Sequence, residues 1–111
     1  MDRGEIYLVN LNPTAGKEER GQNRPVLVIT KKAFNEVSGT PFVVPITNGG
    51  AGFTWKNLTV PLAEAGTITQ GVIITSQVRA IDLTDRGATY VEKLPESILD
   101  EVVAKVQAYL A

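Results

Sequence analysis

Apolar residues along this chain fall into short runs with the length and composition of β-strands. The runs are rich in Val and Ile, and turn-forming Gly, Pro and Asn separate them. The predicted strands lie at residues 5–9, 25–30, 41–46, 58–62, 71–75, 77–81 and 88–92. The run at 25–30 is almost continuously apolar, which predicts a strand buried on both faces. A short helical turn is expected at 32–37.

At two places the sequence pattern does not decide how the predicted strands are arranged. Pro41 and Pro45 bracket one run, and because proline cannot donate a ladder hydrogen bond, they indicate a sheet edge or a strand end. The runs at 71–75 and 77–81 form either one long strand or two strands with a bend between them.

The last part of the chain has a helical period. After Leu94 and Pro95, apolar residues recur at helical spacing while charged residues fall on the other side. The apolar positions are Ile98, Leu99, Val102, Val103, Val106 and Leu110, and the charged ones are Glu96, Asp100, Glu101 and Lys105. The whole pattern predicts a mainly β (α+β) fold, a small antiparallel barrel closed by an amphipathic helix, as a single domain over residues 1–111.

Composition restricts the chemistry more than the fold. Of the 111 residues, 43% are hydrophobic and 21% charged, as in ordinary globular domains, and there is neither cysteine nor histidine. This removes thiolate nucleophiles, the usual acid–base residue at neutral pH and the common transition-metal ligands. Catalysis would therefore rest on carboxylates, hydroxyls, amides, Lys and Arg, and we expect neither a metal nor another cofactor.

Charge and hydropathy bear on location and partners. No apolar run is long enough to span a bilayer, and the N-terminal residues lack the apolar core of a signal peptide, so we expect a cytoplasmic protein without a membrane partner. The formal net charge is −1. A nucleic-acid site would therefore have to be a local cluster of cations.

Polar residues gather in two predicted loops, at 16–24 and 47–56, and in a third cluster of Ser76, Gln77 and Arg79. Loops at one rim of a barrel can converge on a common groove, and loops carry function more often than strands do. We therefore expect the functional site at these segments.

Each polar candidate also has an ordinary structural interpretation. Arg24, which precedes a strand, could be a surface or ion-pair residue. Thr47 could cap its loop through a local side-chain bond. Glu18 and Glu19 could be solvated loop charges.

Aromatic residues beside a cation point more directly to a ligand. Phe53 and Trp55 flank Thr54, and Lys56 follows. Such a pairing suits single-stranded nucleic acid, because bases stack on the rings while cations meet phosphates. The alternative is that one ring faces the core or a second subunit.

An ordered set of motifs along nearly the whole chain resembles one known family. The motifs are Arg3-Gly4-Glu5-Ile6-Tyr7-Leu8-Val9, Asn12-Pro13-Thr14-Ala15-Gly16-Lys17-Glu18, Arg24-Pro25-Val26-Leu27-Val28-Ile29, Val44-Pro45-Ile46-Thr47, Gly71-Val72 and Gln77-Val78-Arg79-Ala80-Ile81-Asp82. In order and spacing they resemble the MazF/PemK (Kid, ChpB) toxins. The resemblance implies an SH3-like barrel of the CcdB/PemK toxin type that forms a homodimer. It also implies a sequence-specific endoribonuclease that cleaves single-stranded mRNA, inhibits translation and growth, and is neutralised by a cognate antitoxin.

The resemblance also implies which residues form the site. In the family, the arginine before the strand-opening proline and the threonine after the Val-Pro stretch are catalytic, and here they match Arg24 and Thr47. The loop carboxylate matches Glu18, and the glutamine of the Gln-Val-Arg motif matches Gln77.

This chain departs from some relatives at three positions. Lys17 stands where some PemK-type members have a histidine. Ile74 and Ser76 stand where Kid-like members have an arginine and an aspartate. We interpret these changes as a different division of labour among the site residues.

RNA can be cleaved without a metal when its own 2′-hydroxyl attacks the adjacent phosphate. In this hypothesis Arg24 stabilises the phosphate charge and is the candidate acid for the leaving 5′-oxygen, since guanidinium pairs with phosphate oxygens. Glu18 is the candidate base, and Thr47 and Gln77 orient the phosphate and the neighbouring base. The further RNA-binding candidates are Ser76, Arg79, Lys17, Asn48, Phe53, Trp55 and Lys56, of which Arg79 and Lys56 would hold flanking phosphates.

Three other functions are alternatives to an RNA-cleaving toxin. A toxin of the same fold could bind a protein target, as the gyrase-directed CcdB toxins do. A catalytically silent RNA-binding member is a second alternative, suggested by Lys17, Ile74 and Ser76. A metal-dependent nuclease is disfavoured, because the acidic residues show no clustered ligand pattern.

Overall fold

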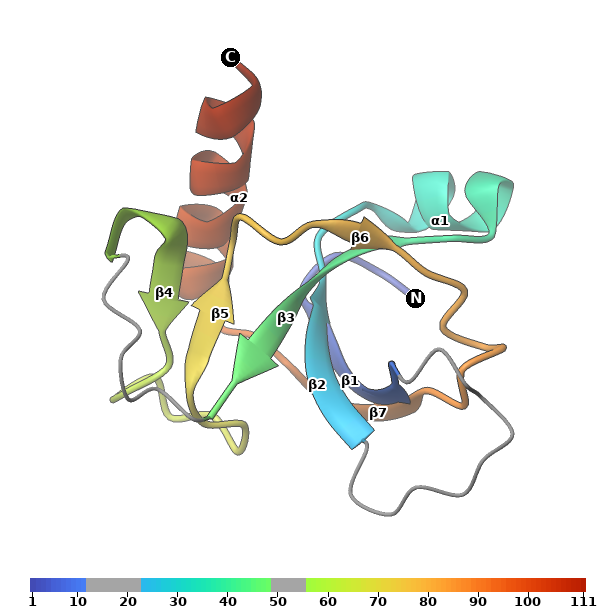
Figure 1. The fold of residues 1–111 in the computed structure, drawn as a ribbon, viewed down its shortest axis with the longest axis horizontal. Coiled ribbons are helices and arrows are strands. Elements are labelled where there is room, and N and C mark those ends of the chain that lie inside the picture. Colours follow the sequence, from blue (N-terminus) through green and yellow to red (C-terminus); the bar gives the residue numbers. More distant parts are fainter. Residues whose placement is uncertain (12–22, 49–55) are drawn as a thin grey trace.

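The computed structural model describes residues 1–11, 23–48 and 56–111 and shows a curved β-sheet with a long C-terminal helix (Figure 1). The strands are β1 (Glu5–Asn10), β2 (Asn23–Val28), β3 (Phe42–Thr47), β4 (Thr59–Pro61), β5 (Val72–Ile74), β6 (Arg79–Ala80) and β7 (Thr89–Lys93). The helices are α1 (Lys32–Ser38), the 3-10 turn η1 (Lys56–Leu58) and α2 (Glu96–Leu110). Within the described ranges, no helix is both long and apolar enough to cross a membrane.

The described strands form one sheet in the order β4-β5-β3-β2-β1-β7, and β6 pairs with β3 as well. Each pairing is antiparallel. The predicted fold class, mainly antiparallel β-structure with a C-terminal helix, is therefore confirmed. Each run predicted to be a strand overlaps one, and the predicted helical turn at 32–37 lies in α1.

The two prolines around β3 have different outcomes. Pro41 precedes the first residue of β3, so the predicted strand end is present there. The interpretation of Pro45 as an edge residue was wrong, because β3 lies between β2 and the strands β5 and β6. Pro45 follows the part of β3 that pairs with β6 and precedes the part that pairs with β5. A residue without an N–H is tolerated where one ladder gives way to another.

The runs at 71–75 and 77–81 are two strands with a bend between them. β5 pairs with the end of β3, and β6 pairs with its beginning. Thr75 and Ser76 form the turn that joins them. Two short strands thus pair with the same edge of β3. Of the run predicted at 77–81, only Arg79–Ala80 forms a strand.

Alternation in β2 divides the core into two parts. Leu27 and Ile29 belong to one buried cluster, whereas Val26 and Val28 belong to another. This confirms that the run is buried on both faces. The helix-side core comprises Ile6, Leu27, Ile29, Val44, Ile46, Val60, Leu62, Ile73, Leu94, Leu99 and Val102. The second core comprises Tyr7, Val9, Val26, Val28, Val43, Ile81 and Leu83.

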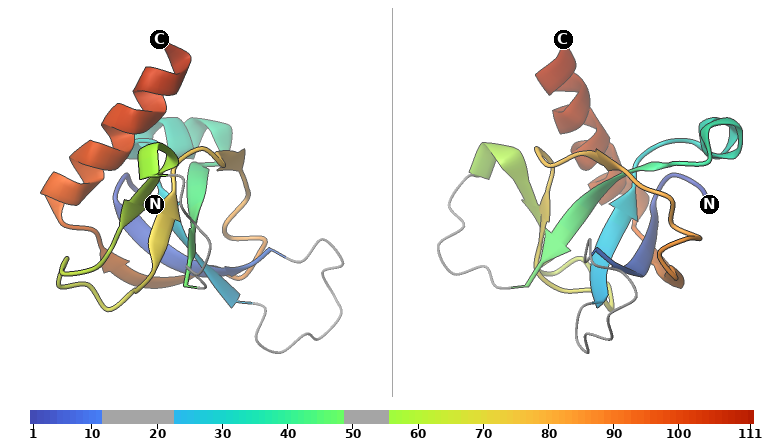
Figure 2. Two further views of the ribbon diagram at one scale, coloured as in Figure 1. Left: turned by 60° about the vertical axis from the view of Figure 1, so that its left-hand side comes forward. Right: turned by 45° about the vertical axis from the view of Figure 1, so that its right-hand side comes forward.

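Helix α2 covers the helix-side core. Its buried residues are Leu99 and Val102, both at apolar positions of the predicted helical stripe. Helix α2 packs against β4 and lies along one side of the sheet (Figure 2). Burying these side chains stabilises the fold by roughly 1.5–3 kcal/mol each. The helix therefore leaves the other face of the sheet to the second core.

Candidate functional site

The first residues of β2 and the last residues of β3 lie at the same end of the sheet (Figure 1). The two strands pair with Val26 opposite Pro45. This pair is the last of the ladder, and Arg24 lies two residues before Val26 while Thr47 lies two residues after Pro45. Opposite residues of antiparallel strands place their side chains on the same face, and so do residues two apart in one strand. The two predicted catalytic residues thus share one face and one end of the sheet, on the side of the second core.

Arg24 is exposed, and no ion pair joins it to another described residue. Its backbone is held in β2, where it lies opposite Val9 of β1. The ion-pair interpretation of Arg24 therefore has no support in residues 1–11, 23–48 and 56–111. Thr47, by contrast, is half-buried. An accessible guanidinium on the same face as a partly covered hydroxyl suits a ligand that approaches from solvent.

A small cavity of about 100 Å³ lies on the face that Arg24 and Thr47 share. Its lining residues are Leu11, Val26, Val43, Pro45, Gln77 and Arg79. Val26 and Val43 belong to the second core, which places the cavity on that side of the sheet. The structure therefore brings Gln77 and Arg79 to the strand segment that ends at Thr47. Ser76 is exposed in the preceding turn.

Gly71 sets the position of the Thr47 backbone. Thr47 pairs with Val72 of β5, and Gly71 precedes that pair with φ +115°. A Cβ atom at Gly71 would lie 2.1 Å from the Thr47 carbonyl oxygen. Only glycine permits both this backbone conformation and this approach. The Gly71-Val72 motif therefore has a local structural reason, which is the placement of Thr47.

The turn before Gln77 is tied to the end of α2 by a residue that sequence reasoning missed. Thr75 is fully buried, and its hydroxyl lies 2.7 Å from the Leu58 carbonyl oxygen and 2.6 Å from the Tyr109 hydroxyl. The Tyr109 hydroxyl in turn donates to the Asn57 carbonyl oxygen at 3.1 Å. Tyr109 thus joins the turn that follows β5 to the segment that follows Lys56. Its place near the end of an amphipathic helix was the available signal, since a tyrosine there can cover apolar surface and still donate a hydrogen bond.

Asn48 belongs to a different cavity. This cavity, of about 460 Å³, lies beside the hairpin of β4 and β5. Its lining residues are Asn48, Pro61, Leu62, Ala63, Glu64, Gly66, Thr67, Gln70, Gly71 and Val72. Gln77 and Arg79 line the other cavity, so the structure does not bring Asn48 together with them. The end of β3 consequently lies between two hollows.

Several predicted site residues fall outside the described residues. They are Lys17, Glu18, Phe53 and Trp55, and of Lys56 only the backbone is described, at the start of η1. Glu19 and Thr54 lie outside as well. The first of these segments joins Leu11 to Asn23, and the second follows Asn48. In the sequence, therefore, the first ends close to Arg24 and the second begins close to Thr47. The roles of these residues as base, stacking rings and phosphate contacts stay predictions.

The two departures from Kid-like members differ in their surroundings. Ile74 is 4% exposed and lies opposite Thr59 of β4, so it is a core residue of the β4–β5 hairpin. Ser76 is exposed and accessible to a ligand. Among the described residues, no three acidic side chains form a group that could hold a metal ion.

Comparison with known proteins covers nearly the whole chain. A family model described as PemK-like, MazF-like toxin of type II toxin–antitoxin system matches residues 2–110. Endoribonuclease PemK of Escherichia coli is 44% identical over 110 residues, which are 99% of this chain and 82% of the relative. The crystal structure of MazF from Deinococcus radiodurans superposes with a TM-score of 0.80 at 31% identity, covering 99% and 96% of the two chains. A MazE–MazF complex from the same organism gives a TM-score of 0.79 at 27% identity, covering 100% and 95%.

Proposed function

The chain belongs to the PemK/MazF family and is an endoribonuclease toxin of a toxin–antitoxin system, and from this premise we propose how its residues cleave RNA. The proposal is sequence-specific cleavage of single-stranded mRNA without a metal, which inhibits translation and growth. The observation that carries it is the shared face of Arg24 and Thr47 at the ends of β2 and β3. A groove that binds one phosphodiester needs such residues from separate segments on one surface.

In the proposed step the RNA 2′-oxygen forms a bond to phosphorus while the bond from phosphorus to the 5′-oxygen breaks. Glu18 takes the proton from the 2′-hydroxyl. Arg24 pairs with the phosphate oxygens as negative charge develops, and supplies a proton to the leaving 5′-oxygen. Thr47 donates to the same phosphate from the neighbouring strand. The proton and charge balance therefore needs no external group.

Recognition of the RNA is assigned to the residues around this centre. Gln77 and Arg79 line one cavity on the cleavage face, which supports roles in holding a base and a flanking phosphate. Ser76, Lys17 and Lys56 add polar contacts along the groove, and Phe53 or Trp55 stacks a nucleotide. Asn48 would contact the RNA from the neighbouring cavity. The bases that these residues select would define the cleaved sequence.

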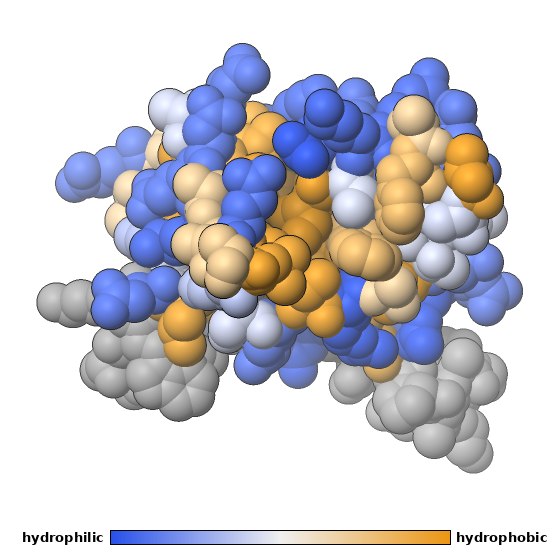
Figure 3. Space-filling model, turned by 90° about the horizontal axis from the view of Figure 1, so that it is seen from above, coloured by the Kyte–Doolittle hydropathy of each residue, from blue (hydrophilic) through white to orange (hydrophobic). Residues whose placement is uncertain are grey.

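Homodimer formation is part of the proposal. Exposed apolar side chains include Phe34, Val37, Phe42 and Val78, and the Phe34 and Phe42 rings are in edge-to-face contact with centroids 5.2 Å apart. Figure 3 shows apolar surface gathered on the side of the molecule seen from above, where Figure 1 places α1 and β6. A second copy related by a two-fold axis would cover this surface. A molar mass of one chain in sedimentation at micromolar concentration would contradict it.

Relatives of this chain have been crystallised as MazE–MazF complexes. The family description names a toxin of a type II toxin–antitoxin system. We therefore propose a cognate antitoxin as the protein partner and the cytoplasm, where mRNA is translated, as the place of action.

Cleavage of a long, weakly structured RNA by the purified protein tests the mechanism. Arg24→Ala should lower kcat by about a thousandfold or more, because a transition-state charge loses its main donor. Arg24→Lys keeps the charge but not the paired donors and should recover only part of the rate. Lys105→Ala, a change on α2, which packs on the helix-side core, is the control and should cleave normally.

The same assay separates the alternatives. Activity that persists in excess chelator supports the metal-free mechanism, and activity lost with the metal contradicts it. RNA binding without cleavage by the unmodified protein would identify a silent RNA-binding member. Full activity of Arg24→Ala would refute the assigned site.

A further inference from the structure

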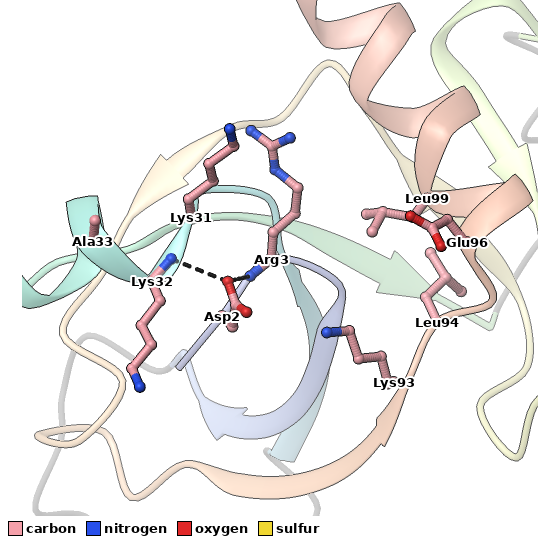
Figure 4. Close-up of a pocket in the computed structure, with 9 residues that line it drawn as sticks. All are labelled: Asp2, Arg3, Lys31, Lys32, Ala33, Lys93, Leu94, Glu96 and Leu99. Atoms are coloured by element: carbon pink, nitrogen blue, oxygen red, sulfur yellow. Dashed lines mark hydrogen bonds between the residues drawn. The ribbon is translucent and has the colours of Figure 1, made fainter.

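A cavity away from the proposed cleavage groove is lined by more cations than carboxylates. It has a volume of about 670 Å³ and lies where the starts of β1, α1 and α2 meet the end of β7 (Figure 4). Its lining residues are Asp2, Arg3, Lys31, Lys32, Ala33, Lys93, Leu94, Glu96 and Leu99. Four of these side chains are cations and two are carboxylates, in a chain whose formal net charge is −1. The mechanism proposed above uses none of them.

Two of the cations have no acidic partner in the described part of the chain. Arg3 donates from Nε to the Ile29 carbonyl oxygen at 2.9 Å, which fixes the guanidinium. No described residue accepts a bond from its terminal NH₂ groups, and no ion pair within 4 Å involves Lys31. In Figure 4 the Arg3 and Lys31 side chains extend in the same direction. Two like charges that extend in the same direction from one cavity favour an anion near them.

The other two lysines differ in what they can offer. Lys93 points toward Asp2 in Figure 4 and attracts that carboxylate without an ion pair within 4 Å. Amide hydrogens of Arg3 and Lys32 bind the Asp2 carboxylate at 2.7 and 3.0 Å and lower its pKa, so this residue stays ionised at neutral pH. Lys32 points away and pairs with Glu36 across an exposed turn of α1 at 3.8 Å. Arg3, Lys31 and Lys93 are therefore the cations available to a ligand.

The chemistry of the walls favours an acidic peptide over a nucleic acid. Leu94 and Leu99 belong to the helix-side core and give the cavity an aliphatic floor, and no aromatic side chain lines it to stack a base. Asp2 and Glu96 would repel a chain that carries a phosphate on every unit. A peptide can place its carboxylates on the cations and an aliphatic side chain on the floor, and can avoid the two acidic residues.

Position also separates this cavity from the cleavage groove. Arg24 stands at the beginning of β2, whereas Lys31 follows the end of that strand, roughly 20 Å away along an extended chain. The floor belongs to the helix-side core, whereas Arg24 and Thr47 lie on the side of the second core. A ligand in the cavity would therefore leave the proposed groove open.

We propose that the cavity formed by Arg3, Lys31, Lys93, Leu94 and Leu99 binds an acidic, partly aliphatic peptide segment of a partner protein. The inference rests on the proposed function in one respect, because it makes the antitoxin the first partner to examine. It assigns that partner a contact outside the RNA groove.

The test uses the full chain and two fluorescent probes, a short peptide that alternates Glu-Glu with Leu-Leu and an oligodeoxythymidylate that cannot be cleaved. Anisotropy titrations at fixed salt give the Kd of each probe. The double variant Lys31→Glu/Lys93→Glu should weaken peptide binding by about tenfold or more. The matched control Lys32→Glu reverses a neighbouring charge that points away, and should change the Kd by less than about twofold. Neither variant should alter RNA cleavage.

Three outcomes would overturn the inference. The first is the absence of saturable peptide binding by the unmodified chain. Equal losses in the double variant and in Lys32→Glu would show general charge attraction. Loss of oligodeoxythymidylate binding with unchanged peptide binding would make the cavity a nucleic-acid surface. Because peptide binding is measured without RNA, a failure of the nuclease proposal would appear separately, as absent cleavage by the unmodified chain.

Discussion

The two ends of the central strands differ in how firmly their side chains are tied. At the end that carries the chain's N-terminus, the buried Asn35 donates to the carbonyl oxygens of Met1 and Thr30, both at 2.9 Å, and accepts from the Thr30 hydroxyl at 2.5 Å. At the other end, Arg24 is exposed and has no ion pair with a described residue. The difference separates stability from chemistry: one end holds the fold together, and the other keeps polar groups available to a substrate.

Replacing Gly71 with alanine should have the largest effect, because it should lower both stability and RNA cleavage. The new Cβ would lie 2.1 Å from the Thr47 carbonyl oxygen, and the backbone has φ +115°, so strain and collision act together at the cleavage end. We expect a loss of more than about 3 kcal/mol in the free energy of unfolding and loss of RNA cleavage in the remaining folded protein. Chemical denaturation and a cleavage assay at low temperature measure the two effects.

Two other glycines serve as matched controls. Gly4 has φ +98°, but a Cβ there would meet the flexible Leu99 side chain at 2.9 Å, so Gly4→Ala should cost less, about 1–2 kcal/mol, and spare cleavage. Gly87 has φ +65° and open space around it, so Gly87→Ala reports backbone strain alone. If all three variants were equally stable, the contact with Thr47 would not be the cause.

Asn35→Ala tests the opposite end of the central strands. It removes the side-chain bonds to Met1 and Thr30 and leaves their polar groups partly unpaired, so we expect a loss of about 2–3 kcal/mol in the free energy of unfolding. The RNA cleavage rate per folded molecule should not change, because the site lies at the other end of β2. Thermal unfolding measures the stability, and the cleavage rate divided by the concentration of folded protein measures the activity.

Glu36→Ala is the control on the same helix, because its pair with Lys32 is 65% exposed on both side chains. It should alter stability by less than about 0.5 kcal/mol. A large drop in cleavage by folded Asn35→Ala would contradict the separation of the two ends.

The sequence predicts the strands because each run alternates or is continuously apolar, and these patterns depend on near neighbours. It misplaces Pro45 because the number of strands beside β3 depends on how distant segments pair. Arg24 and Thr47 were ordinary polar residues until the resemblance singled them out, and their shared face follows from the register of β2 and β3. The cluster of Arg3, Lys31 and Lys93 combines three separate segments, so no local pattern could reveal it.

Tyr109→Phe should have the smallest effect and should test whether the turn before Gln77 is held by its tie to the end of α2. Three close oxygen contacts join Thr75, Tyr109, Asn57 and Leu58, yet the two hydroxyls supply only two hydrogens. Without the Tyr109 hydroxyl, Thr75 still donates to Leu58, so stability should fall by about 1 kcal/mol. Because the turn before Gln77 is then less restrained, KM for RNA should rise by up to about fivefold while kcat stays unchanged. Leu110→Ala, at the 82% exposed neighbour, should leave both constants unchanged, and an equal rise in KM there would assign the effect to the helix end as a whole.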